Sequence, residues 1–384
     1  MMKRVVSIFL GIFLIFGLVS CQAEGGKRGQ EEKNKLDISS SLNHTGEMKL
    51  EYAKEFSVDY YDDGFALIQI SNGDRFLVIP EGKECPKDVD KEIVRIQQPV
   101  RNIYLVASAA MDIFSSLDSL DLIRFSALKA DGWYIEKARK AMEDGEIRYA
   151  GKYSAPDYEQ IISGECGLAI ENTMIYHTPE VKEELEKFGI PVLVDYSSYE
   201  NSPLGRTEWV KLYGLLANKE KKAEELFNEQ ANAFREISSK ERIDKTVAFF
   251  YITGNGEVNV RKSSDYLPKM IKLAGGKYIF EHLGDEEDTA SSTMSMQMEE
   301  FYSSAKDADY IIYNSTIEGE LSSVKDLMGK SPLLKKFKAV KEGNVYCTTK
   351  NLYQSSMEVG TIISDLNKIV TGEDNGLTYI YKLR

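Results

Sequence analysis

Two stretches of the chain, Ala150-Gly151-Lys152-Tyr153 and Gly275-Gly276-Lys277-Tyr278, begin the same series of elements. Each is followed by a stretch that carries a glutamate, Tyr158-Glu159-Gln160-Ile161 in the first case and Met298-Glu299-Glu300-Phe301 in the second, and then by an apolar run. The series predicts a glycine turn, a short helix and a buried strand, twice. Such a duplication indicates two similar lobes, and the cleft between two lobes is where small ligands most often bind.

Strand-like and helical patterns alternate around both stretches. In the first half the strand-like runs are 103–107, 168–171 and 191–195, with helical patterns from Ser108 onward and at 180–188. In the second half the strand-like runs are 246–251, 310–313 and 344–348, with helical patterns at 266–274 and 357–370. This alternation predicts an α/β fold in which each lobe, 99–206 and 242–384, has a mainly parallel sheet covered by helices.

The segment between the lobes, residues 207–241, has a helical pattern almost throughout. Asn218 interrupts the pattern, and beyond it apolar residues such as Ala223, Phe227 and Phe234 recur at helical spacing. Twenty helical residues cover roughly 30 Å, which is the width of a domain. We therefore expect one long helix in this segment to join the lobes.

Residues 51–98, before the first lobe, form a smaller unit. The turn signals Asp62-Asp63-Gly64 and Asn72-Gly73 separate short runs rich in apolar residues. This pattern predicts a small antiparallel β-meander. A unit of this size is marginally stable alone, so we expect it to pack against the first lobe, and we assign it no chemistry.

The N-terminus has the features of a secretory signal. Lys3 and Arg4 precede an apolar run over 5–18, which is shorter than the roughly 20 residues that span a bilayer. The run ends in Leu18-Val19-Ser20-Cys21, which resembles a bacterial lipobox. We therefore expect a signal peptide at 1–20, a lipidated Cys21, and a polar, flexible tether over 21–50 that includes His44. These features predict an extracytoplasmic protein anchored to a membrane.

The net charge and the cysteines exclude several classes of protein. The net charge of −13 argues against a nucleic-acid binder, which needs a basic surface. The other cysteines, Cys85, Cys166 and Cys347, have neither the pairing nor the close spacing of a disulfide framework or a metal motif. Cys166 and Cys347 adjoin strand-like runs and are expected to be small buried side chains.

Motifs in order along 99–371 resemble the class III substrate-binding lipoproteins of ABC importers, the ferric-siderophore, haem and vitamin B12 type. No single motif is diagnostic, and the resemblance rests on their order and spacing. The motifs are Gln98-Pro99-Val100-Arg101-Asn102-Ile103, Tyr149-Ala150-Gly151-Lys152, Ala155-Pro156-Asp157-Tyr158-Glu159, Phe188-Gly189-Ile190-Pro191-Val192, the helix at 218–223, Leu273-Ala274-Gly275-Gly276, and Val340-Lys341-Glu342-Gly343-Asn344-Val345-Tyr346.

The resemblance implies a fold and a set of partners. In this family two Rossmann-like lobes are joined by a single long helix, and the segment 219–240 has that position here. Each lobe presents a glutamate that docks into arginine pockets of a permease dimer, which works with a cytoplasmic ATPase. The matching residues are Glu159 and Glu299, with Glu300 as the weaker choice for the second. Carboxylate–arginine pairs of this kind can be bidentate and can orient two proteins.

Ligands in this family are held by loops at the strand ends that face the cleft. In the first lobe we expect contacts from Ser108, Trp133, Tyr153, Tyr176 and Tyr199, and in the second lobe from Arg261 and Tyr353. Trp133 follows the loop signal Asp131-Gly132 and is expected to offer an exposed stacking surface. No catalytic residue, metal site or cofactor is expected.

The ligand class stays open among several candidates. A ferric siderophore is often a polyanion, which favours arginine and lysine, whereas haem needs an axial ligand and cobalamin favours aromatic walls. The ferric-siderophore class comes first because it is the commonest in such proteins. Bare zinc or manganese is disfavoured because only His44, His177 and His282 are present. An extracytoplasmic enzyme such as a chelatase is the other alternative, but the sequence has no nucleophile, phosphate-loop or metalloprotease motif.

Overall fold

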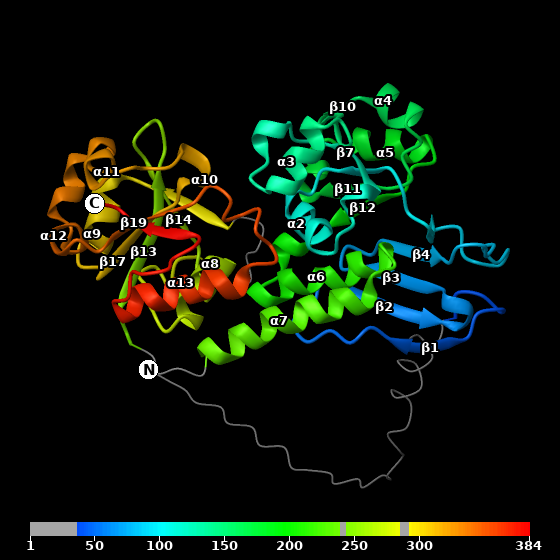
Figure 1. Cartoon of the computed structure of the whole chain (residues 1–384), viewed down its shortest axis with the longest axis horizontal. Helices are drawn as coiled ribbons and strands as arrows, with labels where there is room; N and C mark the ends of the chain where they lie inside the picture. Colours follow the sequence, from blue (N-terminus) through cyan, green and yellow to red (C-terminus); the bar gives the residue numbers. More distant parts are fainter. Residues whose placement is uncertain (1–36, 239–242, 285–291) are drawn as a thin grey trace, which may run out of the picture.

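The structure is a computed structural model that describes residues 37–238, 243–284 and 292–384. Two α/β lobes lie side by side, and an N-terminal sheet adjoins the first of them (Figure 1). The α/β fold and the two parallel-sheet lobes expected from the sequence are thus confirmed. The signal peptide, Cys21 and the tether up to residue 36 lie outside the described residues. Within the described ranges, no helix is long and apolar enough to cross a membrane.

The N-terminal unit is a five-stranded sheet in the order β1-β2-β3-β4-β5. Its first four strands pair antiparallel, as the turn signals predict, and β5 pairs parallel with β4. One face shares a hydrophobic core with the first lobe, which confirms that the unit packs there. The strands are β1 (His44–Glu47), β2 (Phe56–Tyr61), β3 (Ala66–Ile70), β4 (Arg75–Ile79) and β5 (Val94–Gln97).

The expected tether over 21–50 is too long at its C-terminal end. Ile38 and Leu42 are buried in the core on the other face of the N-terminal sheet, together with Leu67 and Leu77. His44, assigned to the tether, is the first residue of β1. The polar composition of this region concealed the two apolar residues that anchor it, so the folded part begins before residue 44.

The first lobe has a fully parallel sheet in the order β12-β11-β6-β7-β8. Because the chain starts at β6 and builds outward in both directions, the strand order reverses between β6 and β11. In such sheets ligands bind at the carboxyl ends of the strands near this switch point. The elements are β6 (Ile103–Leu105), α2 (Ser108–Ser116), β7 (Ile123–Ser126), α3 (Glu136–Glu143), β8 (Arg148–Tyr149), β9 (Gly151–Lys152), β10 (Ala155–Pro156), α4 (Tyr158–Ser163), β11 (Ala169–Asn172), α5 (Pro179–Lys187) and β12 (Val192–Asp195).

The second lobe has a mixed sheet in the order β16-β14-β13-β17-β18-β19, with β15 also paired to β13. Its centre, β13, β17 and β18, is parallel as expected, while β14, β16 and β19 add antiparallel edges. The elements are β13 (Thr246–Ile252), β14 (Val258–Arg261), α8 (Tyr266–Leu273), β15 (Lys277–Tyr278), β16 (Thr293–Met296), α9 (Met298–Ala305), β17 (Tyr310–Tyr313), α10 (Ser315–Glu318), α11 (Val324–Lys330), α12 (Lys338–Glu342), β18 (Val345–Thr348), α13 (Val359–Thr371) and β19 (Ile380–Lys382).

The segment between the lobes forms two helices, α6 (Pro203–Leu216) and α7 (Glu220–Ser238), which lie side by side (Figure 1). The chain turns between them at Asn218, whose φ is 54°, so the break predicted at this residue is confirmed. α6 is buried along almost its whole length, since it packs between the N-terminal sheet and the first lobe. α7 reaches both lobes, because Phe227 belongs to the core of the first and Ile237 to the core of the second.

The repeated glycine motif has a conformational reason in its first copy. Gly151 has a φ of +83°, and a Cβ at this position would lie 2.3 Å from the carbonyl oxygen of Ala155. Only glycine fits such a turn. The turn brings β9 against β10 and leads into α4, which carries Glu159.

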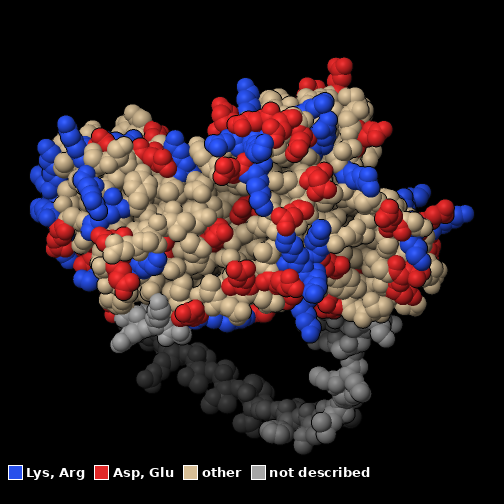
Figure 2. Space-filling view, viewed as in Figure 1, with Lys and Arg blue, Asp and Glu red and all other residues tan. Residues whose placement is uncertain are grey.

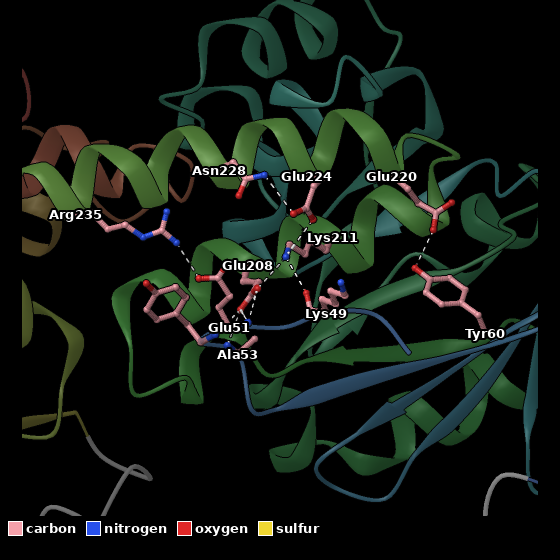
Figure 3. Close-up of polar contacts among 11 residues, drawn as sticks. Lys49, Glu51, Ala53, Tyr60, Glu208, Lys211, Glu220, Glu224, Asn228 and Arg235 are labelled. Atoms are coloured by element: carbon pink, nitrogen blue, oxygen red, sulfur yellow. Dashed lines mark hydrogen bonds and ion pairs between the residues drawn. The ribbon is translucent and has the colours of Figure 1, made fainter. Parts of the chain in front are cut away.

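Residues 49–55, which we call the strap, connect β1 to β2 and are held by two buried glutamates, Glu200 and Glu208, of which Figure 3 shows Glu208. The carboxylate of Glu208 accepts hydrogen bonds from the backbone N–H groups of Glu51, Tyr52 and Ala53 at 2.7–3.1 Å. The carboxylate of Glu200 accepts from the N–H groups of Lys54 and Glu55 at 3.0 Å. Two side chains thus satisfy five consecutive backbone donors.

Lys211 completes this arrangement. Its Nζ lies 3.1 Å from Glu208 Oε1 and 3.1 Å from Glu224 Oε2, and it donates to the carbonyl oxygen of Lys49 at 2.9 Å (Figure 3). The strap therefore ties the N-terminal sheet to both α6 and α7. Because Glu208 and Lys211 are both buried, removing either partner would leave an uncompensated charge inside the protein.

One buried carboxyl group in the first lobe has no hydrogen-bond partner in the described part of the chain. Both oxygens of Glu171, near the end of β11, are buried and unsatisfied. Because burial disfavours the charged form, it raises the pKa of Glu171 to about 8 from an ordinary 4.5. The folded protein therefore holds a proton on Glu171 between pH 4.5 and 8, where the unfolded chain has released it.

Replacing Glu171 with glutamine is expected to stabilise the protein at alkaline pH. Since the folded state binds the extra proton, the free energy of unfolding of the wild type falls as pH rises from 4.5 to 8, by up to about 5 kcal/mol. The Glu171→Gln variant lacks this group, so it matches the wild type near pH 4.5 and exceeds it at pH 8. Denaturant unfolding at pH 4.5, 6 and 8 measures this, with the exposed Glu183→Gln as the control. Parallel pH profiles for wild type and Glu171→Gln would contradict the raised pKa.

Candidate ligand-binding site

A cavity of about 240 Å³ lies between the two lobes. The first lobe lines it with Ala109 at the start of α2, Ser197 and Ser198 after β12, and Arg206 of α6. The start of α2 and the end of β12 are at the carboxyl ends of strands, where the reversal of strand order predicts a binding site. The second lobe contributes the end of β14, the start of α8, the residue before β16 and the segment between β18 and α13, through Arg261, Asp265, Tyr266, Ser292, Tyr353 and Ser355.

Arg261, the last residue of β14, is held firmly in this cavity. Its Nη1 lies 3.4 Å from Asp265 Oδ2 and 3.2 Å from Ser292 Oγ, its Nη2 donates to the hydroxyl of Tyr353, and its Cζ lies 4.8 Å from the centroid of the Tyr353 ring. Burial opposes the charge, but Tyr353, Asp265 and Tyr266 outweigh it and hold the pKa of Arg261 above its ordinary value. The guanidinium therefore stays charged in a largely buried site.

Arg206 provides a second cation from the opposite lobe. Its Cζ lies 3.9 Å from the ring centroid of Tyr266, a close cation–π contact. Among the described residues, no carboxylate lies within 4.0 Å of its guanidinium. The cavity thus contains two guanidinium groups and one carboxylate, Asp265, and this balance favours an anionic ligand.

The segment between β18 and α13 bridges the lobes beside the cavity. Gln354 accepts from the backbone N–H of Tyr134 and donates to the carbonyl of Gly132, both at 2.8 Å. Met357 N–H donates to Asp112 of α2 at 2.8 Å. Burial raises the pKa of Asp112 to about 6, although this hydrogen bond lowers it. The two lobes are therefore in direct contact. The contact is made by the segment that also carries Tyr353.

The structure brings together only part of the predicted ligand set. Arg261 and Tyr353 line the cavity, and Tyr199 lines a small hollow that adjoins it and shares Ser198, Asp265 and Tyr266 with it. Ser108 precedes the cavity-lining Ala109 but does not line the cavity itself. Tyr153 packs against a core on the outer side of the first-lobe sheet.

The structure contradicts the expected exposure of Trp133, and it places Tyr176 outside the cavity lining. Trp133 is 1% exposed, and its Nε1 donates to Ser126 Oγ at 3.0 Å. It is a core residue rather than a stacking surface, because the loop signal before it marks a turn that directs the ring inward. Tyr176 is exposed, but its hydroxyl is bonded to Asn72 of the N-terminal sheet and to Tyr196, away from the cavity.

Three important residues, Arg206, Asp265 and Tyr266, were not predicted from the sequence. A signal for two of them existed: Asp265 caps α8 by accepting from Leu267 N–H at 2.8 Å, and the start of a helix that follows a strand tends to face the binding edge of a sheet. Arg206 had no such signal, since it lies inside a helix.

The glutamates predicted to dock with a permease occupy equivalent positions. Glu159 lies in the first turn of α4 and Glu299 in the first turn of α9, and both are exposed. Neither carboxylate has an ion-pair partner among the residues that the structure describes, so both are available to another protein. Glu300 is exposed beside Glu299.

The charged surface is mixed on the face drawn in Figure 2. Acidic and basic side chains alternate over the first lobe and the N-terminal sheet, while Lys and Arg gather at the outer end of the second lobe. No broad basic surface follows the gap between the lobes in this view.

Comparisons with known proteins agree with this architecture. An uncharacterized lipoprotein of Methanocaldococcus jannaschii is 25% identical, and the alignment covers 97% of this chain and 94% of that protein. Among solved structures, the periplasmic haem-binding protein HutB of Vibrio cholerae matches with a TM-score of 0.56 at 15% identity, over 69% of this chain and 98% of that one. The catecholate-siderophore binding protein VctP of Vibrio cholerae matches with a TM-score of 0.54 at 16% identity, over 70% and 94%. These solved structures share the fold.

The family comparison confirms the resemblance found in the sequence. The family described as periplasmic binding protein matches residues 124–352, which include both sides of the cavity and the helices between the lobes. Because the match extends over more than half of the chain, the protein belongs to the periplasmic binding protein family.

Proposed function

We propose that this protein is the extracytoplasmic substrate-binding receptor of an ABC importer, and that it captures an anionic ferric chelate of the siderophore type between its lobes. The observation that carries this proposal is the pair of arginines in one cavity, Arg206 from the first lobe and Arg261 from the second. An anionic chelate would contact both, so its binding would hold the lobes together. The absence of an ion-pair partner for Arg206 among the described residues supports the same ligand charge.

The relatives support the location and the ligand class. Two of the curated relatives are named lipoproteins, which supports lipidation at Cys21 and anchoring to the membrane. One solved neighbour is a catecholate-siderophore binding protein. Because the family consists of binding proteins, capture and delivery explain the cavity better than catalysis.

Haem is the second candidate, and one contact favours it. The hydroxyl of Tyr353 is bonded to the guanidinium of Arg261 and accepts from Asn314 Nδ2 at 3.1 Å. Burial holds the pKa of Tyr353 above its ordinary value, but these two donors lower it and so favour a phenolate, which is a known axial ligand of haem iron. HutB, which shares the fold, binds haem.

Isothermal titration of the full-length chain in detergent micelles tests the proposal. The probes are a ferric tris-catecholate, ferric citrate, haemin and cyanocobalamin. We expect saturable binding of a ferric chelate that carries negative charge, with one site per chain. Binding of haemin alone would replace the proposal by the haem alternative, and a lack of binding to every ferric probe would refute it.

Replacing Glu159 and Glu299 together with alanine is expected to abolish uptake without changing the affinity for the ligand. Both residues are exposed and remote from the cavity lining, and bidentate carboxylate–arginine pairs orient two proteins at an interface. The measurement is transport into vesicles that contain the permease and its ATPase, beside titration of the purified variant. Glu300→Ala is the matched control and should transport normally. A loss of ligand affinity in the double variant would disprove the docking role.

A further inference from the structure

Three metal-ligating side chains meet on the N-terminal sheet, far from the interlobe cavity. They are His44 and Glu47 of β1 and Asp59 of β2, and their ligand atoms all lie within 4.8 Å of one another. β1 is the edge strand of the sheet, on the side away from the first lobe (Figure 1). No part of the proposed transport function uses this cluster.

An irregularity in β1 creates the cluster. Residues three positions apart, such as His44 and Glu47, point to opposite faces of a regular strand. Here His44 pairs with Tyr61, and Glu47 pairs with Asp59. The two paired positions are therefore three residues apart in β1 but only two residues apart in β2. The register shift between His44 and Gly46 therefore puts both side chains on the face that carries Asp59. Bulges of this type commonly redirect a side chain beside a functional site.

The distance between His44 and Asp59 suits a shared metal ion. His44 Nε2 lies 3.2 Å from Asp59 Oδ1, and two ligand atoms at the usual distance of about 2.1 Å from one zinc ion lie about 3.0–3.4 Å apart. The groups around the ligands also hold them in place. Asp59 is 5% exposed, its Oδ2 accepts from Gln69 Nε2 at 2.9 Å, and the His44 ring packs edge-on against Tyr61. Such outer contacts are typical of metal ligands.

The charges of the cluster favour a cation as well. Glu47 and Asp59 are directly opposite each other on neighbouring strands, a position in which like charges are destabilising. His44 contacts Asp59, but within the described ranges no lysine or arginine forms an ion pair with Glu47. A divalent ion would neutralise both carboxylates.

We propose that His44, Glu47 and Asp59 bind one divalent first-row transition ion, with water in the remaining positions. One imidazole nitrogen and two carboxylate oxygens suit Zn²⁺ or Mn²⁺, whereas Mg²⁺ and Ca²⁺ prefer oxygen ligands alone. By joining β1 to β2, the ion would fasten the edge strand of the N-terminal sheet.

Titration of Zn²⁺ into the chelator-treated, full-length chain in detergent micelles tests this site. We expect one equivalent to bind to the wild type and to raise its melting temperature. His44→Ala and Glu47→Gln should each weaken binding at least about tenfold, and Glu47 is exposed at an edge, so its variant retains the fold. His282→Ala is the matched control, because His282 is an exposed histidine 3.4 Å from Glu281 that belongs to no group of three metal-ligating side chains among the described residues, and it should bind like the wild type.

A simple ion pair between His44 and Asp59 makes a different prediction. In that case Zn²⁺ would not change the melting temperature of the wild type, and the isotherms of wild type and His44→Ala would coincide. Either result would overturn the proposal. Co²⁺ gives an independent reading, since a visible absorption band that is lost in His44→Ala requires coordination by the imidazole.

Discussion

Replacing Arg261 with glutamine is expected to reduce the affinity for an anionic ferric chelate by about 2–5 kcal/mol, which is roughly 30-fold to several thousand-fold. The guanidinium is largely buried beside Tyr353 and Ser292, and its charge is maintained there. Removing it takes away a desolvated cation and leaves Asp265 as the only charged partner for the ligand on that side. The lower affinity should appear as faster dissociation of the ligand. Buried charge pairs form only after the ligand has entered the site, so they affect the dissociation rate more than the association rate.

Two controls separate binding from folding in this experiment. Arg235→Gln removes an arginine outside the cavity, on α7 beside Glu51 (Figure 3), and should leave affinity unchanged. Arg261→Lys keeps the positive charge but loses the planar guanidinium group, which can donate two parallel hydrogen bonds. We therefore expect an intermediate affinity. Equal affinities for the wild type and a folded Arg261→Gln variant would exclude Arg261 from the ligand site and would leave Arg206 to be tested in the same way.

Replacing Glu208 with glutamine is expected to lower the free energy of unfolding by about 3–5 kcal/mol. Glu208 is fully buried, accepts three backbone hydrogen bonds from the strap and pairs with Lys211. The amide cannot match this acceptor capacity, and Lys211 loses its buried counter-charge. Because α6 and α7 both contact this cluster, the change should loosen the N-terminal sheet and the helices between the lobes together.

Calorimetry and hydrogen exchange measure this effect. For a chain of this size the melting temperature should fall by roughly 4–7 °C, with faster exchange of the amides at 51–53. Glu224→Gln is the matched control: it removes the other carboxylate bonded to Lys211, but Glu224 is 53% exposed, so its loss should cost less than about 1 kcal/mol. Similar losses in the two variants would mean that the strap is not held mainly by Glu208.

Much of the architecture could be predicted because it depends on local patterns. The central strands β6, β11, β13 and β17 were expected from continuous apolar runs, and such strands are buried on both faces of a parallel sheet. The turn at Asn72-Gly73 and the break at Asn218 follow from residues that tolerate turn conformations. The antiparallel edge strands β14, β16 and β19 were missed, since short edge strands lack a continuous apolar run.

The sequence by itself determined that this chain is a two-lobed α/β binding protein, and it singled out Arg261 and Tyr353 as ligand contacts of the second lobe. Periodicity, turns and ordered motifs are properties of neighbouring residues, so they can be read along the chain. Only the tertiary structure decided that Arg206 and Tyr266 meet across the lobes, that Trp133 is buried, and that His44 joins Glu47 and Asp59. These outcomes depend on strand register, on helix placement and on which segments pack together, and those are set by contacts between residues far apart in the sequence.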